Sequence, residues 1–136
     1  MSTTTSTAAG NVKTRADIKR EIYILGEQYA TAMKAHQKAS DNLRKLQQKK
    51  EENSENILSL TASLDRERCP EKRVITNQCI RKNKITRTKI LKNLEEALKV
   101  EERRRDAMEE AEAMWKFEAM CSGEAYQENG QWKWRD

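Results

Sequence analysis

The chain has few of the residues that build compact domains. It contains one proline, four glycines and only 5% aromatic residues, while 36% of its 136 residues are charged. A small domain needs a high apolar content, because it buries only part of its surface on folding. The composition therefore argues against a globule and is typical of a long helix or coiled coil that buries a narrow apolar stripe. Disorder is the competing interpretation.

Other absences bear on function. The single histidine and the three cysteines form no CxxC pair and no local four-ligand set, so we expect no metal site and reduced thiols, as in the cytoplasm or nucleus. The sequence contains no glycine-rich phosphate loop and no recognisable nucleophile, so we expect no catalytic residues, no cofactor and no small-molecule substrate. No apolar run approaches the roughly 18 residues of a membrane span.

The first 15 residues differ in composition from the rest. They are rich in Ser and Thr and contain no acid. They lack the apolar middle of a signal peptide, so the sequence predicts a disordered N-terminal arm over residues 1–15. A mitochondrial transit peptide is the alternative.

The strongest pattern is a heptad stripe between Ile18 and Leu64. Steps of four and three residues give fourteen positions, of which eleven are apolar. The positions are Ile18, Ile22, Leu25, Tyr29, Ala32, His36, Ala39, Leu43, Leu46, Lys50, Asn53, Ile57, Leu60 and Leu64. An a/d pattern sustained for this length predicts a helix over residues 16–64, with left-handed supercoiling.

Pro70, the only proline, predicts an interruption after this helix. It removes an N–H group and restricts Cys69 to extended geometry, so we expect a turn over residues 65–71. A second helix is predicted over residues 72–120, with Ser122 and Gly123 as its stop. Its broad apolar face includes Ile80, Leu91, Leu94, Leu98, Met108, Ala111, Trp115 and Ala119.

The nearly equal helix lengths predict an all-α, elongated antiparallel hairpin. Facing residues would have numbers that sum to about 136, which puts Ile57 near Ile80, Leu43 near Leu94 and Ile22 near Trp115. The polar residues that interrupt the two apolar faces then lie opposite each other, with Asn53 near Asn83 and His36 near Glu101. A parallel dimer through the first helix is the alternative, with Lys50 or Asn53 setting its register. The His36–Glu101 pair is either pH-sensitive or a polar pair tolerated in the stripe.

A basic block follows the turn. Between Lys72 and Leu94 there are eight cations and no acid, although the net charge of the chain is only +5. With the two arginines of the turn, the candidate patch for an acidic partner is Arg66, Arg68, Lys72, Arg73, Arg81, Lys82, Lys84, Arg87, Lys89 and Lys92. Nucleic acid, tubulin and anionic lipid are partners of matching charge, and a solvated face is the alternative. The lack of aromatic residues there argues against base stacking.

The C-terminal tail, residues 121–136, is the one part with a β signal. Asn129 and Gly130 form a two-residue turn signal, which predicts that Gln127 pairs with Trp132 and Ala125 with Trp134. Alternation puts Trp132 and Trp134 on one face. The turn resembles those of engineered tryptophan-zipper hairpins. Tyr126, Trp132 and Trp134 are therefore predicted to contact either a partner or the helix ends beside them.

These features together favour a non-enzymatic structural or adaptor subunit of a hetero-oligomeric assembly, of cytoskeletal, centrosomal, kinetochore or tethering type. Its partners would be other coiled-coil proteins, in the cytoplasm or nucleus. Met114, Phe117 and Met120, beside Trp115, form either a docking face or a thicker core. The expected helix-binding positions are Ile18, Ile22, Leu25, Tyr29, Leu43, Leu46, Ile57, Leu60, Leu64, Leu94, Leu98, Met108 and Trp115. A binder of nucleic acid or microtubules and a hairpin-type chaperone are the alternatives.

Overall fold

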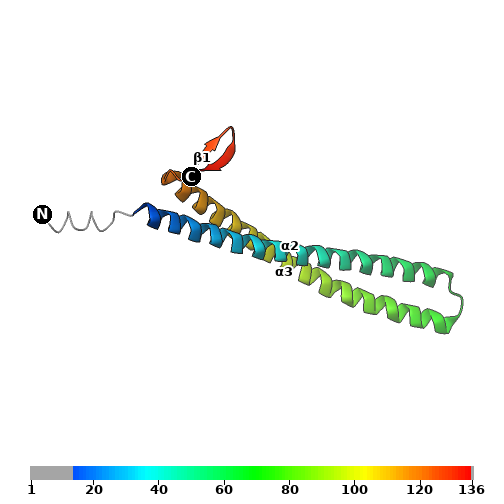
Figure 1. The fold of residues 1–136 in the computed structure, drawn as a ribbon. Helices are drawn as coiled ribbons and strands as arrows, with labels where there is room; N and C mark the ends of the chain where they lie inside the picture. The colour runs from blue at the N-terminus through cyan, green and yellow to red at the C-terminus, as the bar shows by residue number, and fades with distance from the viewer. Residues whose placement is uncertain (1–13, 136) are drawn as a thin grey trace, which may run out of the picture. The chain divides into compact units, whose positions relative to one another are not determined.

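The computed structural model describes residues 14–135. It consists of two long antiparallel helices, α2 (Arg15–Arg66) and α3 (Pro70–Cys121), followed by strands β1 (Ala125–Glu128) and β2 (Gln131–Trp134) (Figure 1). The predicted all-α hairpin with a small C-terminal β-hairpin is confirmed. The predicted N-terminal arm lies almost wholly outside the described residues.

The start of α2 follows from its first residues. The Thr14 hydroxyl accepts a hydrogen bond from the Asp17 amide at 3.1 Å, and Asp17 Oδ2 accepts one from the Thr14 amide at 3.4 Å. This reciprocal arrangement satisfies two N–H groups at the helix start, as in a capping box. Asp17 also places negative charge in the first turn, where the helix dipole favours it.

The turn between the helices is shorter than the sequence predicts. The helices extend to Arg66 and begin again at Pro70, whereas the predicted turn covers residues 65–71. Pro70 can be the first helical residue, because the N–H group that it lacks would have no partner there. Arg73 then closes the end of α2, since its Nη1 donates to the carbonyl oxygens of Leu64 at 2.8 Å and Glu67 at 2.9 Å.

The register of the hairpin pairs the polar residues of the two helices as predicted. Asn53 Nδ2 donates to the Asn83 carbonyl at 3.0 Å, and His36 Nε2 lies 2.9 Å from Glu101 Oε1. All fourteen stripe positions from Ile18 to Leu64 are buried or half-buried. The heptad pattern therefore identifies the inward face of α2.

The chain comprises two compact units. One contains described residues 14–35 and 105–135, and the other is His36–Arg104. The core of the first is built around Ile22, Ala119 and Ala125, with Ile18 and Trp115 packed against them. Ile80, Leu94 and Ala97 are the buried apolar residues of the second. No large side chain of the described chain is fully buried, so both cores are thin.

The strand pair has the predicted register. Ala125 pairs with Trp134, Tyr126 with Lys133, Gln127 with Trp132, and Glu128 with Gln131. Asn129 has a φ of 54° and Gly130 a φ of 78°, the positive values that a type I′ turn requires at both central positions.

Candidate interaction site

A stack of three aromatic rings lies in the unit that contains the start of α2, the end of α3 and the strand pair. The rings of Tyr29 and Trp115 lie 5.5 Å apart at 28°, and those of Trp115 and Trp134 lie 5.5 Å apart at 35°. Trp115 thus packs between a ring of α2 and a ring of β2. Separations and tilts of this kind are favourable for aromatic pairs.

Small residues make room for the stack. A Cβ atom on Gly26 would lie 3.1 Å from Nε1 of Trp115 and 3.4 Å from its Cε2. Ala119 of α3 and Ala125 of β1 are almost completely buried and belong to the core against which Trp115 packs. A larger residue at Gly26 would displace the indole ring.

One ion pair connects the start of α2 with the residue that precedes β1. Arg15 Nε donates to Glu124 Oε1 at 3.0 Å, and the Glu124 side chain is 10% exposed. The Arg135 amide donates to the Glu124 carbonyl at 2.7 Å. Because the Arg15 charge compensates the carboxylate, Glu124 can be buried next to the apolar core.

Tyr29 connects the stack to a charged pair on α3. Burial raises the pKa of the Tyr29 phenol above its ordinary value of 10.0, and the negative charge and hydrogen bond of Glu112 raise it further. Lys116, which is ion-paired with Glu112, acts in the opposite direction. The neutral phenol is therefore the form that this site favours.

A groove lies beside the stack. It has a volume of about 300 Å³ and is lined by the rings of Tyr23, Trp115 and Trp134 together with Ile22. Lys19, Glu124 and Arg135 complete its lining. Tyr23 is 68% exposed and Trp134 47% exposed, so two of the three rings also face solvent.

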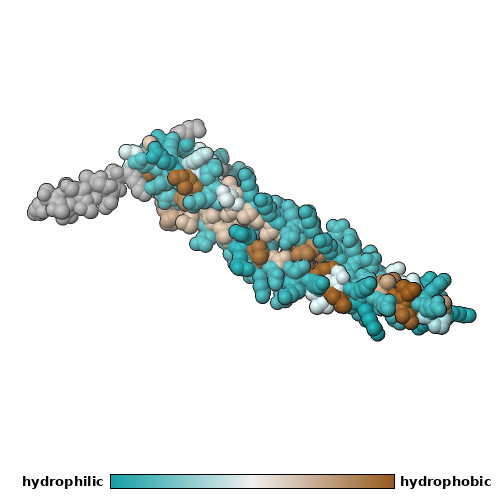
Figure 2. All heavy atoms as spheres, turned by 90° about the horizontal axis from the view of Figure 1, so that it is seen from below, coloured by the Kyte–Doolittle hydropathy of each residue, from teal (hydrophilic) through white to brown (hydrophobic). Residues whose placement is uncertain are grey.

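Large apolar side chains that the hairpin leaves uncovered are numerous. On α3 they include Val74, Ile75 and Ile85 in one unit and Met114 and Phe117 in the other. Phe117, Leu58 and Tyr23 are each about 70% exposed. Figure 2 shows one face of the chain, where brown apolar groups alternate with hydrophilic side chains. The second helix is therefore apolar on more than the side that faces α2.

The unit His36–Arg104 has a buried polar side chain at the contact between its two helices. The Asn53 side chain is buried, and its Oδ1 has no hydrogen-bond partner among the described residues.

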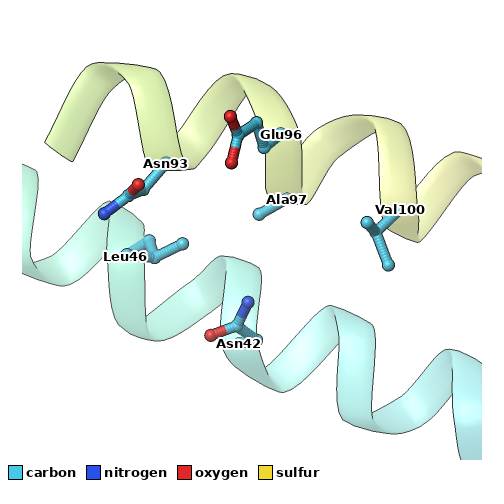
Figure 3. A pocket seen from close by; sticks show the side chains of 6 residues that line it. All are labelled: Asn42, Leu46, Asn93, Glu96, Ala97 and Val100. Atoms are coloured by element: carbon cyan, nitrogen blue, oxygen red, sulfur yellow. The ribbon is translucent and has the colours of Figure 1, made fainter. Parts of the chain in front are cut away.

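A second groove, of about 360 Å³, is lined by Asn42, Leu46, Asn93, Glu96, Ala97 and Val100 (Figure 3). None of these six described residues has an aromatic ring, which distinguishes this groove from the one beside the stack.

The basic block lies on α3 of the same unit. Arg73 is used inside the chain, to close the end of α2. The exposed cations from Arg81 to Lys92 form no ion pair with an acid within residues 14–135. Three pairs among them, beginning with Arg81 and Lys84, are spaced i,i+3, where like charges destabilise a helix.

Comparison with family models, curated proteins and solved structures finds no match for this chain. Among residues 14–135, no helix combines the length and apolar character needed to cross a membrane. The same residues contain no group of three or more His, Cys, Asp or Glu side chains arranged to hold a metal ion.

The predicted helix-binding positions lie mainly inside the hairpin. All but Leu98, which is 50% exposed, are buried or half-buried. Of the predicted C-terminal contacts, Trp134 joins the stack, and the Arg135 guanidinium lies 5.5 Å from the centre of the Tyr126 ring. The side chain of Trp132 is outside the described part of the structure.

Sequence reasoning missed three residues of the site. Gly26 lies in the interior of a predicted helix, where glycine is unfavourable, and this anomaly was the available signal. Arg15 and Glu124 pair across 109 positions of the sequence, and no local pattern marks such a contact.

Proposed function

We propose that this protein is a non-enzymatic structural or adaptor subunit that binds helices of other coiled-coil proteins. The supporting observation is the set of large apolar side chains that remains exposed after the hairpin has formed. On α3 of the unit His36–Arg104, Val74 is 56% exposed and Ile75 and Ile85 are each 60% exposed. A helix that is apolar on more than one side usually packs against more than one neighbour.

The thin core supports the same proposal. Two helices bury little apolar area between them, and most of the stability of a protein helix comes from tertiary packing. A further helix on α3 would remove Val74, Ile75 and Ile85 from water. At about 25 cal/mol per Å² of apolar surface, covering such side chains stabilises an assembly appreciably. Exposed apolar patches commonly mark protein–protein contact sites.

Crosslinking of the full chain in native cells, followed by mass spectrometry, tests this proposal. We expect crosslinks from α3 to helical segments of one or a few other proteins. A variant with Ile75→Glu and Ile85→Glu should lose them while its far-UV circular dichroism stays unchanged. A matched variant with Thr86→Glu and Thr88→Glu adds the same charge to the same helix and should keep most of them. A stable monomer, alone and in cells, would overturn the proposal.

A second candidate function is binding to an acidic polymer. It is supported by the exposed cations between Arg81 and Lys92, which have no acidic partner in the part of the chain that the structure describes. Binding through such cations would be tolerant of sequence and would weaken steeply with salt, because it depends on phosphate or carboxylate charge.

Binding to RNA, DNA and microtubules at low salt tests the second candidate. Replacing Arg81, Lys82, Lys84 and Arg87 with Gln should abolish it. Replacing four cations of α2 (Lys34, Lys38, Lys45 and Lys49) with Gln lowers the net charge equally and should have a smaller effect. Equal binding by both variants and the unaltered chain would exclude this function for the block.

A further inference from the structure

The groove beside the aromatic stack has two kinds of surface close together. Tyr23, Trp115, Trp134 and Ile22 provide apolar and aromatic area, and Lys19 and Arg135 provide positive charge. Both cations are exposed, and neither has an ion-pair partner within the described chain. Lys19 belongs to α2, whereas Arg135 follows β2, so the strand pair is needed to bring the two charges to one groove.

The acidic group of the groove is already compensated. Among the described residues that line it, Glu124 is the only acid, and its carboxylate accepts the hydrogen bond from Arg15. The groove therefore presents an excess of positive charge next to exposed rings. A cationic ligand would be repelled by Lys19 and Arg135, although aromatic rings alone would attract it. The charge instead favours an occupant that carries carboxylates.

The size of the groove limits the occupant further. Its volume of about 300 Å³ is at the lower end of the range for ligand pockets. One bulky side chain suits this volume, while a whole helix would extend beyond it. Aromatic and Met side chains are the common anchors of such contacts.

We propose that the groove binds an acidic segment of a partner protein, which inserts one bulky apolar side chain beside Trp115 and Trp134 and places carboxylates next to Lys19 and Arg135. The inference rests on the proposed function, because it assigns partner chemistry to an adaptor. It concerns a different surface from the exposed aliphatic side chains of α3.

The chain's own N-terminal residues do not have this chemistry. Residues 1–13 contain no acid, and their only large apolar residues are Met1 and Val12. They would match neither the cations nor the rings of the groove. A partner segment fits both features.

The test is a titration of the full chain with a short synthetic peptide that carries one phenylalanine flanked by glutamates. Tryptophan fluorescence and backbone amide NMR shifts report binding. We expect saturable binding with shifts at Ile22, Tyr23 and Ala119. A peptide with lysine in place of glutamate, and one with serine in place of phenylalanine, should bind at least about tenfold more weakly.

Charge reversal in the groove provides the matched control. Lys19→Glu with Arg135→Glu should weaken the acidic peptide about tenfold or more, since two favourable ion contacts become unfavourable. Lys45→Glu with Lys49→Glu changes the net charge equally at exposed positions of the other unit and should leave binding nearly unchanged. Equal losses in both variants, or equal binding of the lysine peptide, would overturn the proposal.

Two other occupants would be recognised by the same experiment. If the groove signals shift with protein concentration before peptide is added, a second copy of the chain fills the groove. If peptide binds only after residues 2–12 are deleted, the N-terminal residues fill it. Either result overturns the partner assignment. Peptide binding without crosslinks from α3 would support the groove proposal and contradict the helix-binding role. Crosslinks without peptide binding would support the helix-binding role and contradict the groove proposal.

Discussion

Gly26 is a glycine inside a long helix, and its position opposite Trp115 gives the reason. In a helix interior, glycine is less stable than alanine by roughly 0.5–1 kcal/mol. Here the missing Cβ makes room for an indole ring that is held between Tyr29 and Trp134. The local cost is thus offset by aromatic packing.

Gly26→Ala should lower the free energy of unfolding by about 1 kcal/mol, because the new Cβ overpacks the stack by more than the helix gains. Urea unfolding followed by circular dichroism measures the change. The same substitution in a Trp115→Leu background should instead stabilise the chain by up to about 1 kcal/mol. Equal effects in both backgrounds would contradict the explanation.

The raised pKa of Tyr29 predicts a loss of stability in alkali. The folded-state pKa lies above the unfolded value near 10, so the contribution is fully present below pH 10 and is lost as the pH rises through the folded pKa. Between pH 9 and roughly pH 12 the unaltered chain should therefore lose more stability than a Tyr29→Phe variant. Parallel urea titrations at several pH values test this, and identical slopes for the two chains would contradict it.

At the scale of elements, the contact between α2 and α3 includes a buried polar residue. Asn53 donates to the Asn83 carbonyl, but its own Oδ1 lacks a partner among the described residues. Such a residue lowers stability while it specifies register, as a buried asparagine does in coiled coils.

Asn53→Leu should raise the free energy of unfolding by about 1 kcal/mol, since it removes a buried amide oxygen that lacks a described partner and adds apolar packing. It should also allow further registers or oligomers, seen as additional species in size-exclusion chromatography with light scattering. Ile57→Leu, a neighbouring volume-conserving change, should give one species. A lower stability for Asn53→Leu would show that the amide is worth more than its burial costs.

The strand pair is the other element with a testable role. A lone two-stranded hairpin is marginal in water, and here it is supported by Trp115, Ala119 and the Arg15–Glu124 ion pair. The contact of Trp134 with Trp115 indicates that the tail covers the helix ends as well as bordering a groove.

Truncation after Gly123 should destabilise the unit at the helix ends by about 2 kcal/mol, because it uncovers Ile22 and Trp115. Thermal unfolding and amide hydrogen exchange at Ile22 and Ala119 measure this loss. Trp134→Ala should account for most of it. Unchanged exchange at both amides would show that the tail does not support the helices.

For the whole molecule, charge is distributed unevenly along the chain. Eight cations and no acid lie between Lys72 and Leu94, whereas acids predominate in the rest of α3. Charge of one sign costs the helix stability through repulsion between neighbours, so an acidic ligand would stabilise this segment. This asymmetry and the exposed aliphatic side chains support the proposal that the chain binds partners.

Much of this architecture is already present in short-range patterns. Heptad spacing predicts α2 and its inward face, Pro70 predicts the turn, and Asn129-Gly130 predicts the strand pair with its register. In the predicted hairpin register, polar residues of one helix lie opposite polar residues of the other. This predicts the contacts of Asn53 with Asn83 and of His36 with Glu101. These features follow from helix periodicity and turn geometry, which depend on neighbours in the sequence.

Three-dimensional packing decides the rest. The placement of Trp134 on Trp115, the need for glycine opposite that ring, and the Arg15–Glu124 pair join residues that lie far apart in the chain. The groove exists only because helix ends and strands meet there, and side-chain volume and desolvation determine which surfaces touch. Periodicity identifies which faces are apolar, but only the packed structure shows which of those faces remain exposed.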